Sequence, residues 1–177
     1  MASLRDFRIP IKGLPEGSSL WEYEMLPDFF TLLEDVQSVD GTFHVTVDAF
    51  KKPGIIQLDI SVSGHKKASC DICLTEIHVP AQGEYTLYCK YIGDHMDEQE
   101  EDVIIIDQEQ SHLSLAMYFY EYILLSLPIT NRIDCEEMPD RPCDDEVLDK
   151  MEDPIIDDQQ EENENPWDTL RDIQIDS

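Results

Sequence analysis

The sequence is poor in basic residues and has no long apolar run. Its 177 residues include 40 acidic and 12 basic side chains, which gives a net charge of −28. Lys and Arg supply most of the contacts to nucleic-acid phosphates and most of the attraction to anionic membranes. The excess of acidic residues therefore argues against nucleic acids and membranes as primary partners. It favours basic protein partners instead. No stretch reaches the ~18 apolar residues of a membrane-spanning helix, and the N-terminus lacks the apolar stretch of a secretory signal peptide. We therefore expect a cytoplasmic protein.

The common catalytic motifs are also lacking. The seven glycines are scattered, which excludes a glycine-rich phosphate loop, and the five histidines form no HExxH pattern. No GxSxG motif is present either. Carboxylate pairs are abundant, but so acidic a chain contains them by chance. We therefore expect no enzymatic activity.

The charge distribution predicts three parts. Residues 1–133 form a core domain, residues 134–164 an acidic, largely flexible arm, and residues 165–177 a short amphipathic docking segment. Residues 134–177 hold 18 acidic and 3 basic side chains, and such low hydrophobicity with high charge does not recover the entropy cost of ordering. Trp167 and Leu170 give the last segment an apolar face that docks either on this protein's own sheet or on a partner.

The residue pattern of the core domain predicts an α+β fold with an antiparallel, curved sheet. Apolar residues alternate with polar ones over 43–49 and 56–62, which predicts a hairpin turning at 51–54. A second hairpin is predicted around Gln82-Gly83, between strands at 76–79 and 85–91. Shorter strands are expected at 7–11, 20–25 and 103–106.

One main helix is predicted to cover the apolar face of this sheet. It runs from Leu113 to Leu127, with Ser111 as its N-cap and Pro128 ending it. Helical spacing selects one apolar stripe: Leu113, Ala116, Met117, Tyr120, Leu124 and Leu127. The apolar surface continues through Leu115, Phe119 and Ile123. A shorter helix is expected at 27–36, and we expect Tyr120 and Leu124 to lie in the core.

Four of the five cysteines are candidate metal ligands. Cys70 and Cys73 have the spacing of a zinc knuckle, and Cys135 and Cys143 are the natural further ligands. Seven residues separate the second pair, more than the usual two to four. The sequence therefore favours a protein that folds without a cofactor, with a four-cysteine zinc site as the alternative. A thioredoxin-like role is disfavoured because the motif lies between strands rather than at a helix N-terminus.

Two lysine pairs are candidate RNA contacts. Lys51 and Lys52 lie at one end of the strand beginning near Ile55, and Lys66 and Lys67 lie past its other end. About nine residues of strand separate them, or roughly 30 Å. That separation is too large for one compact basic patch.

Three segments, in order, resemble the YceD family, the large ribosomal RNA subunit accumulation proteins. They are CDICLTEI, LSLAMYFYEYILLSLPIT and the terminal NPWDTLRDI. The resemblance covers the chain from about Ser61 onward, and Ile72 stands where the family usually has arginine. It implies a bacterial cytoplasmic protein needed for accumulation of 23S rRNA, with a role in ribosome assembly and no known catalytic residues. Plastid relatives are linked to processing of the same RNA.

The charge suggests how such a protein would act. An acidic arm would neutralise a basic ribosomal protein, or the basic surface of a pre-large-subunit particle, and release it to RNA. The alternative is direct binding of precursor rRNA by Lys51, Lys52, Lys66 and Lys67, with the acidic arm as a competitor. Trp167 and Leu170 are expected to contact the partner. The sequence indicates no particular oligomeric state.

Overall fold

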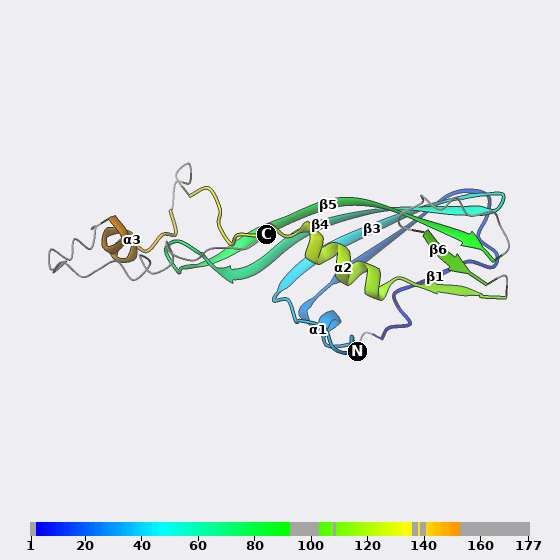
Figure 1. Ribbon diagram of the computed structural model, residues 1–177, viewed down its shortest axis with the longest axis horizontal. Coiled ribbons are helices and arrows are strands. Elements are labelled where there is room, and N and C mark those ends of the chain that lie inside the picture. Colours follow the sequence, from blue (N-terminus) through cyan, green and yellow to red (C-terminus); the bar gives the residue numbers. More distant parts are fainter. Residues whose placement is uncertain (1–2, 93–102, 108, 136–137, 139–140, 153–177) are drawn as a thin grey trace, which may run out of the picture.

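The computed structural model describes residues 3–92, 103–107, 109–135, 138 and 141–152, and it shows an α+β fold (Figure 1). The main sheet has five strands in the order β2-β3-β4-β5-β6, and β1 pairs with β7 in a separate two-stranded sheet. The strands are β1 (Arg8–Pro10), β2 (Gly17–Met25), β3 (Gly41–Lys52), β4 (Ile55–Ser69), β5 (Glu76–Tyr91), β6 (Val103–Ile106) and β7 (His112–Ser114). The helices are α1 (Pro27–Phe30), α2 (Ala116–Ser126) and α3 (Asp145–Glu152).

The alternating segments form the long antiparallel centre of the main sheet. Strands β3 and β4 pair in register from Lys52 opposite Ile55 to Gly41 opposite Lys66. Pro53 and Gly54 make the turn between them, and Gly54 has a φ of +82°, a value that glycine adopts without strain. One face of each strand is buried and the other is exposed or half-buried. The predicted hairpin is confirmed, with a shorter turn than expected.

The hairpin predicted at Gln82-Gly83 is wrong. These residues lie inside the continuous strand β5, which pairs with β4 along its length. Gly83 is needed because α2 crosses here: a Cβ at this position would lie 2.5 Å from Ser126 Oγ. The rings of Tyr85 and Tyr122 stack at 4.3 Å, and the Tyr85 hydroxyl lies 3.0 Å from Ser126 Oγ. The glycine therefore marks a close helix–strand contact, not a turn.

Strand β6 has the predicted bounds but the opposite direction to that expected. It runs parallel to β5, with Tyr88 opposite Val103 and Tyr91 opposite Ile106. The sheet is therefore mostly antiparallel rather than wholly so. A parallel neighbour requires a crossover connection instead of a tight turn, and sequence alternation does not reveal strand direction.

The main helix begins three residues later than predicted. Residues 112–114 form β7, which pairs with β1. Ser111 does not cap a helix; its carbonyl accepts a hydrogen bond from the backbone N–H of Ile11. The buried residues of α2 are Ala116, Phe119, Tyr122, Ile123 and Ser126. The expected core positions are therefore wrong: Tyr120 is half-buried, and Leu124 is 36% exposed. The face continuing through Leu115, Phe119 and Ile123 is the one that packs on the sheet.

The remaining helices also differ from expectation. Helix α1 spans only four residues, and its Phe29 and Phe30 are buried in the main core. Helix α3 lies within the segment predicted as a flexible arm, where the acidic sequence gave no sign of a helix. The mobility of that arm and the three-part division of the chain stay predictions. Trp167 and Leu170 lie outside the described residues.

Candidate functional site

The CxxC motif lies at the tip of the long β4–β5 hairpin, beyond the end of β3 (Figure 1). Cys70 begins the turn, and its backbone N–H donates to the Thr75 carbonyl at 2.8 Å. The Leu74 N–H donates back to the Cys70 carbonyl at 3.1 Å, and Leu74 has a φ of +62°, which is uncommon for a non-glycine residue. The tight turn directs both cysteine side chains inward: Cys70 is 4% exposed and Cys73 2%.

The chain that follows α2 returns to this tip. The Asp71 N–H donates to the Asn131 carbonyl at 2.9 Å, and the Asn131 N–H donates to the Asp71 carboxylate at 2.7 Å. Beyond this anchor, a small apolar cluster forms that is separate from the main core. Its members are Cys70, Cys73, Ile77 and Val79, packed by Ala68, Ile133, Cys143 and Leu148. The hairpin tip therefore shares one small core with Ile133, Cys143 and Leu148.

The four cysteines predicted as ligands line a single cavity of about 490 Å³. The Cys73 thiol contacts those of Cys70 and Cys143, and the Cys143 thiol also contacts that of Cys135. The fold thus unites two pairs that are more than 60 positions apart in the sequence. However, among the residues that the structure describes, no three His, Cys, Asp or Glu side chains surround a common point as metal ligands would. The contacts run as a chain of thiols.

Backbone N–H groups surround the cysteine cluster. Those of Thr75 and Asp144 donate to the Cys73 sulfur and lower the pKa of its thiol, because they stabilise a thiolate. The Ile72 N–H donates to Cys70 Sγ at 3.4 Å. Burial and contact with the neighbouring thiols raise the pKa of the Cys143 thiol. The fifth cysteine, Cys89, lies in the main core away from this cluster.

The two lysine pairs lie at opposite ends of the β3–β4 ladder, apart from each other as the sequence predicted, but Lys66 and Lys67 lie inside β4 rather than past its end. Lys51 pairs with Ile56 at one end of the β3–β4 ladder, and Lys66 pairs with Gly41 at the other. The Lys51 ammonium donates to the Leu14 carbonyl at 2.9 Å, and that of Lys52 lies 5.0 Å from the centre of the Phe50 ring. Lys67 forms an ion pair with Glu76 at 2.8 Å. The lysines therefore form no single patch, and three of the four have local partners.

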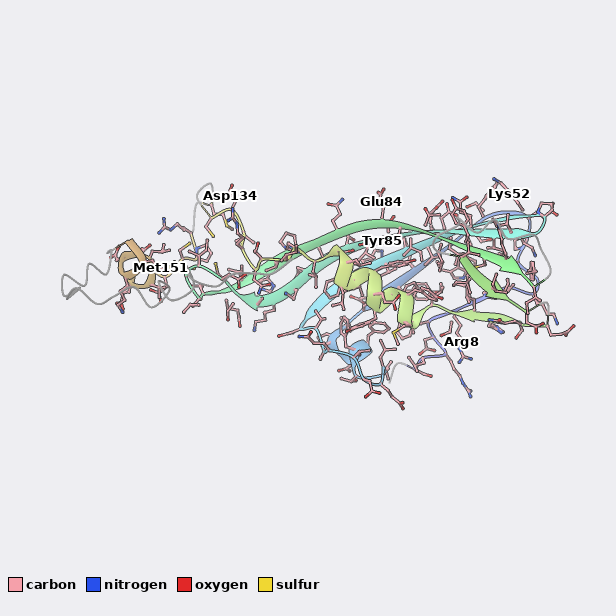
Figure 2. The ribbon with its side chains drawn as sticks, viewed as in Figure 1. Arg8, Lys52, Glu84, Tyr85, Asp134 and Met151 are labelled. Atoms are coloured by element: carbon pink, nitrogen blue, oxygen red, sulfur yellow. The ribbon has the colours of Figure 1, made fainter. Side chains whose placement is uncertain are left out.

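The face of the main sheet opposite α2 carries a patch of exposed carboxylates that sequence reasoning missed. This open-face patch consists of Glu22, Glu24, Asp48, Asp59 and Glu84, from four neighbouring strands. Figure 2 shows Glu84 directed away from α2 and the adjacent Tyr85 directed toward it. The alternation in the sequence shows that these residues are exposed, but only the strand register brings them together.

The register gives the patch its composition. One row across the sheet reads Glu22, Thr46, Ser61 and Glu84, and the next reads Leu20, Asp48, Asp59 and Thr86. Asp59 accepts hydrogen bonds from the Thr86 hydroxyl at 2.8 Å and from the Gln57 amide at 3.0 Å. In these rows and in the row of Glu24, all of which the structure describes, no Lys or Arg is present. The patch is uniformly acidic.

A comparison with protein-family models matches residues 58–174 to the YceD family, described as large ribosomal RNA subunit accumulation protein YceD. Neither the curated proteins nor the solved structures yield a match. Of the helices within the described residues, none is long and apolar enough to cross a membrane.

Proposed function

The chain belongs to the YceD family, and from this membership we propose that it is a non-enzymatic assembly factor that supports accumulation of the large-subunit (23S) rRNA. The family match covers the hairpin tip, α2 and the cysteine-bearing segment. It begins inside β4 and therefore also includes Asp59 and Glu84 of the open-face patch. Such a factor would act where ribosomes are assembled, in the bacterial cytoplasm.

The partner that fits the molecule best is a basic ribosomal protein, free or on a pre-large-subunit particle. The open-face patch is the observation that carries this proposal, because five exposed carboxylates without an intervening Lys or Arg attract a cationic surface. The net charge of −28 acts in the same direction over longer range. The protein would keep the basic partner soluble and give way to rRNA, whose charge density is higher.

Direct binding of precursor rRNA is the competing function. It would use Lys51, Lys52, Lys66 and Lys67, but the first two lie at the far end of β3 from the others. Phosphate binding weakens with each local partner that a lysine already has, and Lys67 is paired with Glu76. The two functions differ in what neutralising the open-face patch should do.

The test replaces the five carboxylates of the patch with their amides: Glu22→Gln, Glu24→Gln, Asp48→Asn, Asp59→Asn and Glu84→Gln. A matched control makes the same change of charge at exposed carboxylates outside the patch: Glu16, Asp28, Glu34, Glu121 and Asp149. Binding of purified basic large-subunit proteins is measured at low and at physiological salt. We expect the patch variant to bind about tenfold more weakly at low salt, mainly through a slower on-rate, and the control to change much less.

Binding of a 23S rRNA fragment is measured in parallel. Under the protein-partner proposal, rRNA binding by the patch variant stays weak or rises slightly, because negative charge is lost. Equal affinity of the patch and control variants for every basic protein would overturn the proposed surface. Loss of rRNA binding on replacing the four lysines with methionine, with protein binding unaffected, would establish the competing function.

The acidic arm makes a second, separable contribution in this proposal. Removing residues 153–164 takes away 6 of its acidic side chains but leaves all four candidate ligands and α3 in place. We expect slower association with basic proteins at low salt and somewhat stronger binding of rRNA fragments. Unchanged rates for both would show that residues 153–164 take no part.

A further inference from the structure

We propose that the free edge of β2 binds an extended basic segment of the partner protein, which adds to the main sheet as one more strand. This inference rests on the proposed function, because it names the part of the basic partner that is recognised. The segment would pair with β2 through backbone hydrogen bonds and place its lysine or arginine side chains beside the open-face patch. Strand β2 precedes residues 58–174, so the family match does not include it.

Strand β2 has a strand neighbour on one side only. It stands at one end of the strand order and pairs with β3 over nine residues without a break in register. Among the residues that the structure describes, no segment other than β3 forms a backbone hydrogen bond with β2. The other side of β2 is therefore a row of backbone N–H and C=O groups that a further strand could satisfy.

The alternation of hydrogen bonds shows which groups of β2 are free. The Lys67 N–H donates to the Asp40 carbonyl at 2.7 Å, which continues the β3–β4 ladder one position past Gly41. Even-numbered residues of β3 therefore bond to β4 and odd-numbered ones to β2, because the two kinds of pair alternate along an antiparallel ladder. The odd-numbered residues of β3 are opposite odd-numbered residues of β2. The backbone groups directed to the free edge are consequently those of Ser18, Leu20, Glu22 and Glu24.

The β2 edge lacks most of the features that protect such edges from added strands. Proline, lysine, bulges and short length are the usual protection, and β2 has none of them. Strand β5 also lacks an outer strand before Tyr88, where β6 begins, but Pro80 interrupts that edge. The charges on β2 are those of Glu22 and Glu24, which repel an acidic strand and attract a basic one. The edge therefore selects the charge of the strand that it accepts.

The side chains along β2 specify an alternating partner sequence. Leu20, Glu22 and Glu24 are exposed on the open face, whereas Trp21 and Tyr23 are half-buried against the main core. Successive side chains of an added strand also point to opposite faces. Those beside Glu22 and Glu24 would be lysine or arginine, and those beside Trp21 and Tyr23 would be apolar. The expected ligand is an extended segment in which basic and apolar residues alternate.

A second copy of this chain fits the edge less well. Pairing of two β2 strands about a twofold axis would bring Glu22 and Glu24 of one chain close to those of the other. Like charges on neighbouring strands destabilise their pairing, and the net charge of −28 adds repulsion at longer range. With a basic segment, the same side chains contribute attraction.

The first experiment uses a short synthetic peptide in which lysine alternates with valine. Two further versions are N-methylated at either the lysine amides or the valine amides, which keeps the charge but removes one alternate set of donors. An added strand uses only one set against β2. One methylated peptide should therefore bind at least about tenfold more weakly than the unmodified peptide, and the other about equally well. Equal affinities of the two methylated peptides, or no binding of the unmodified peptide at low salt, would overturn strand addition.

The second experiment locates the peptide by hydrogen exchange, measured by NMR on the full chain. In the free protein the amides of Leu20, Glu22 and Glu24 should exchange quickly, and those of Trp21 and Tyr23 slowly. Saturating peptide should slow the first set at least about tenfold. Protection of another edge instead would overturn the proposal. Two results would assign the edge to another occupant: protection of the free protein that rises with its concentration, or protection that is lost when residues 165–177 are removed.

A pair of variants tests the same edge from the protein side. Leu20→Pro removes one edge donor and blocks the approach of a strand, and proline is tolerated on the free side of an edge strand. Leu20→Thr is the control, because it loses the same side chain but keeps the N–H. We expect peptide binding at least about tenfold weaker for Leu20→Pro than for Leu20→Thr, with a thermal melt confirming that both variants are folded. If Leu20→Pro does not fold, the methylated peptides decide the question.

Failure of strand addition is distinguishable from failure of the proposed function. Suppose that the methylated peptides bind equally and Leu20→Pro has no effect, while amides in place of the open-face patch still weaken binding of basic proteins. The basic partner would then bind the patch without adding a strand, and only the inference about β2 would be wrong. Equal binding of basic proteins by the patch variant and its control would instead overturn the proposed surface.

Discussion

The sharpest test of the fold compares two residues on α2. Phe119 is fully buried, and its ring centre lies 4.9 Å from that of Tyr23. Replacing it with alanine removes an entire aromatic ring from the main core and leaves a cavity, which costs about 3–5 kcal/mol of unfolding free energy. Leu124 is already 36% exposed, so Leu124→Ala should cost about 1 kcal/mol or less. The apolar stripe expected from the sequence puts Leu124 in the core and predicts a loss of about 2–5 kcal/mol for Leu124→Ala.

Urea denaturation followed by circular dichroism measures both variants. With a slope of about 2 kcal/mol per molar urea, Phe119→Ala should lower the midpoint by roughly 2 M and Leu124→Ala by less than about 0.5 M. Equal shifts, or a larger shift for Leu124→Ala, would show that α2 packs through another face.

Two further predictions concern the main sheet. Gly83→Ala should destabilise the protein by about 1–3 kcal/mol, because its Cβ would meet Ser126 Oγ and the Tyr85 hydroxyl at 2.5 and 2.6 Å; a neutral result in the same urea assay would mean that α2 does not approach β5 here. Cys89 is buried, and burial raises the pKa of its thiol to about 12. Iodoacetamide at pH 8 should therefore leave Cys89 unmodified in native protein and modify it in guanidinium chloride, as mapped by peptide mass spectrometry, and rapid native labelling would contradict its burial.

The strands could be predicted where one face is buried and the other is exposed to solvent. The alternation from Phe43 to Ala49 leaves little choice of structure, and β3 follows it. Gly83 was misread because a glycine that admits a crossing helix and a glycine that makes a turn look alike in sequence. The direction of β6 and the shift of the buried face of α2 both depend on packing between distant segments. Local periodicity contains no information about that packing.

The sequence groups the four candidate ligands but does not show how they come together. The spacing of Cys70 and Cys73 gave a recognisable half-site, and the pairing with Cys135 and Cys143 followed from cysteine count alone. Their convergence depends on the return of the chain after α2, anchored by Asp71 and Asn131. The open-face patch gave no signal in sequence, because its carboxylates come from four strands. Only the pairing register of the strands brings these acidic residues together into a patch.

The length of the β4–β5 hairpin determines where the sheet should open locally. Strand β3 begins at Gly41, opposite Lys66, so the last three pairs of the hairpin have no flanking strand on either side. Amide hydrogens in that projecting ribbon open to solvent more readily than those in the centre of β4, which lies between β3 and β5. Hydrogen exchange should therefore quicken stepwise from Val62 toward Ser69. The Asp71–Asn131 hydrogen bonds hold its tip, so opening of the ribbon should also release the chain that follows α2 while the body of the sheet stays folded.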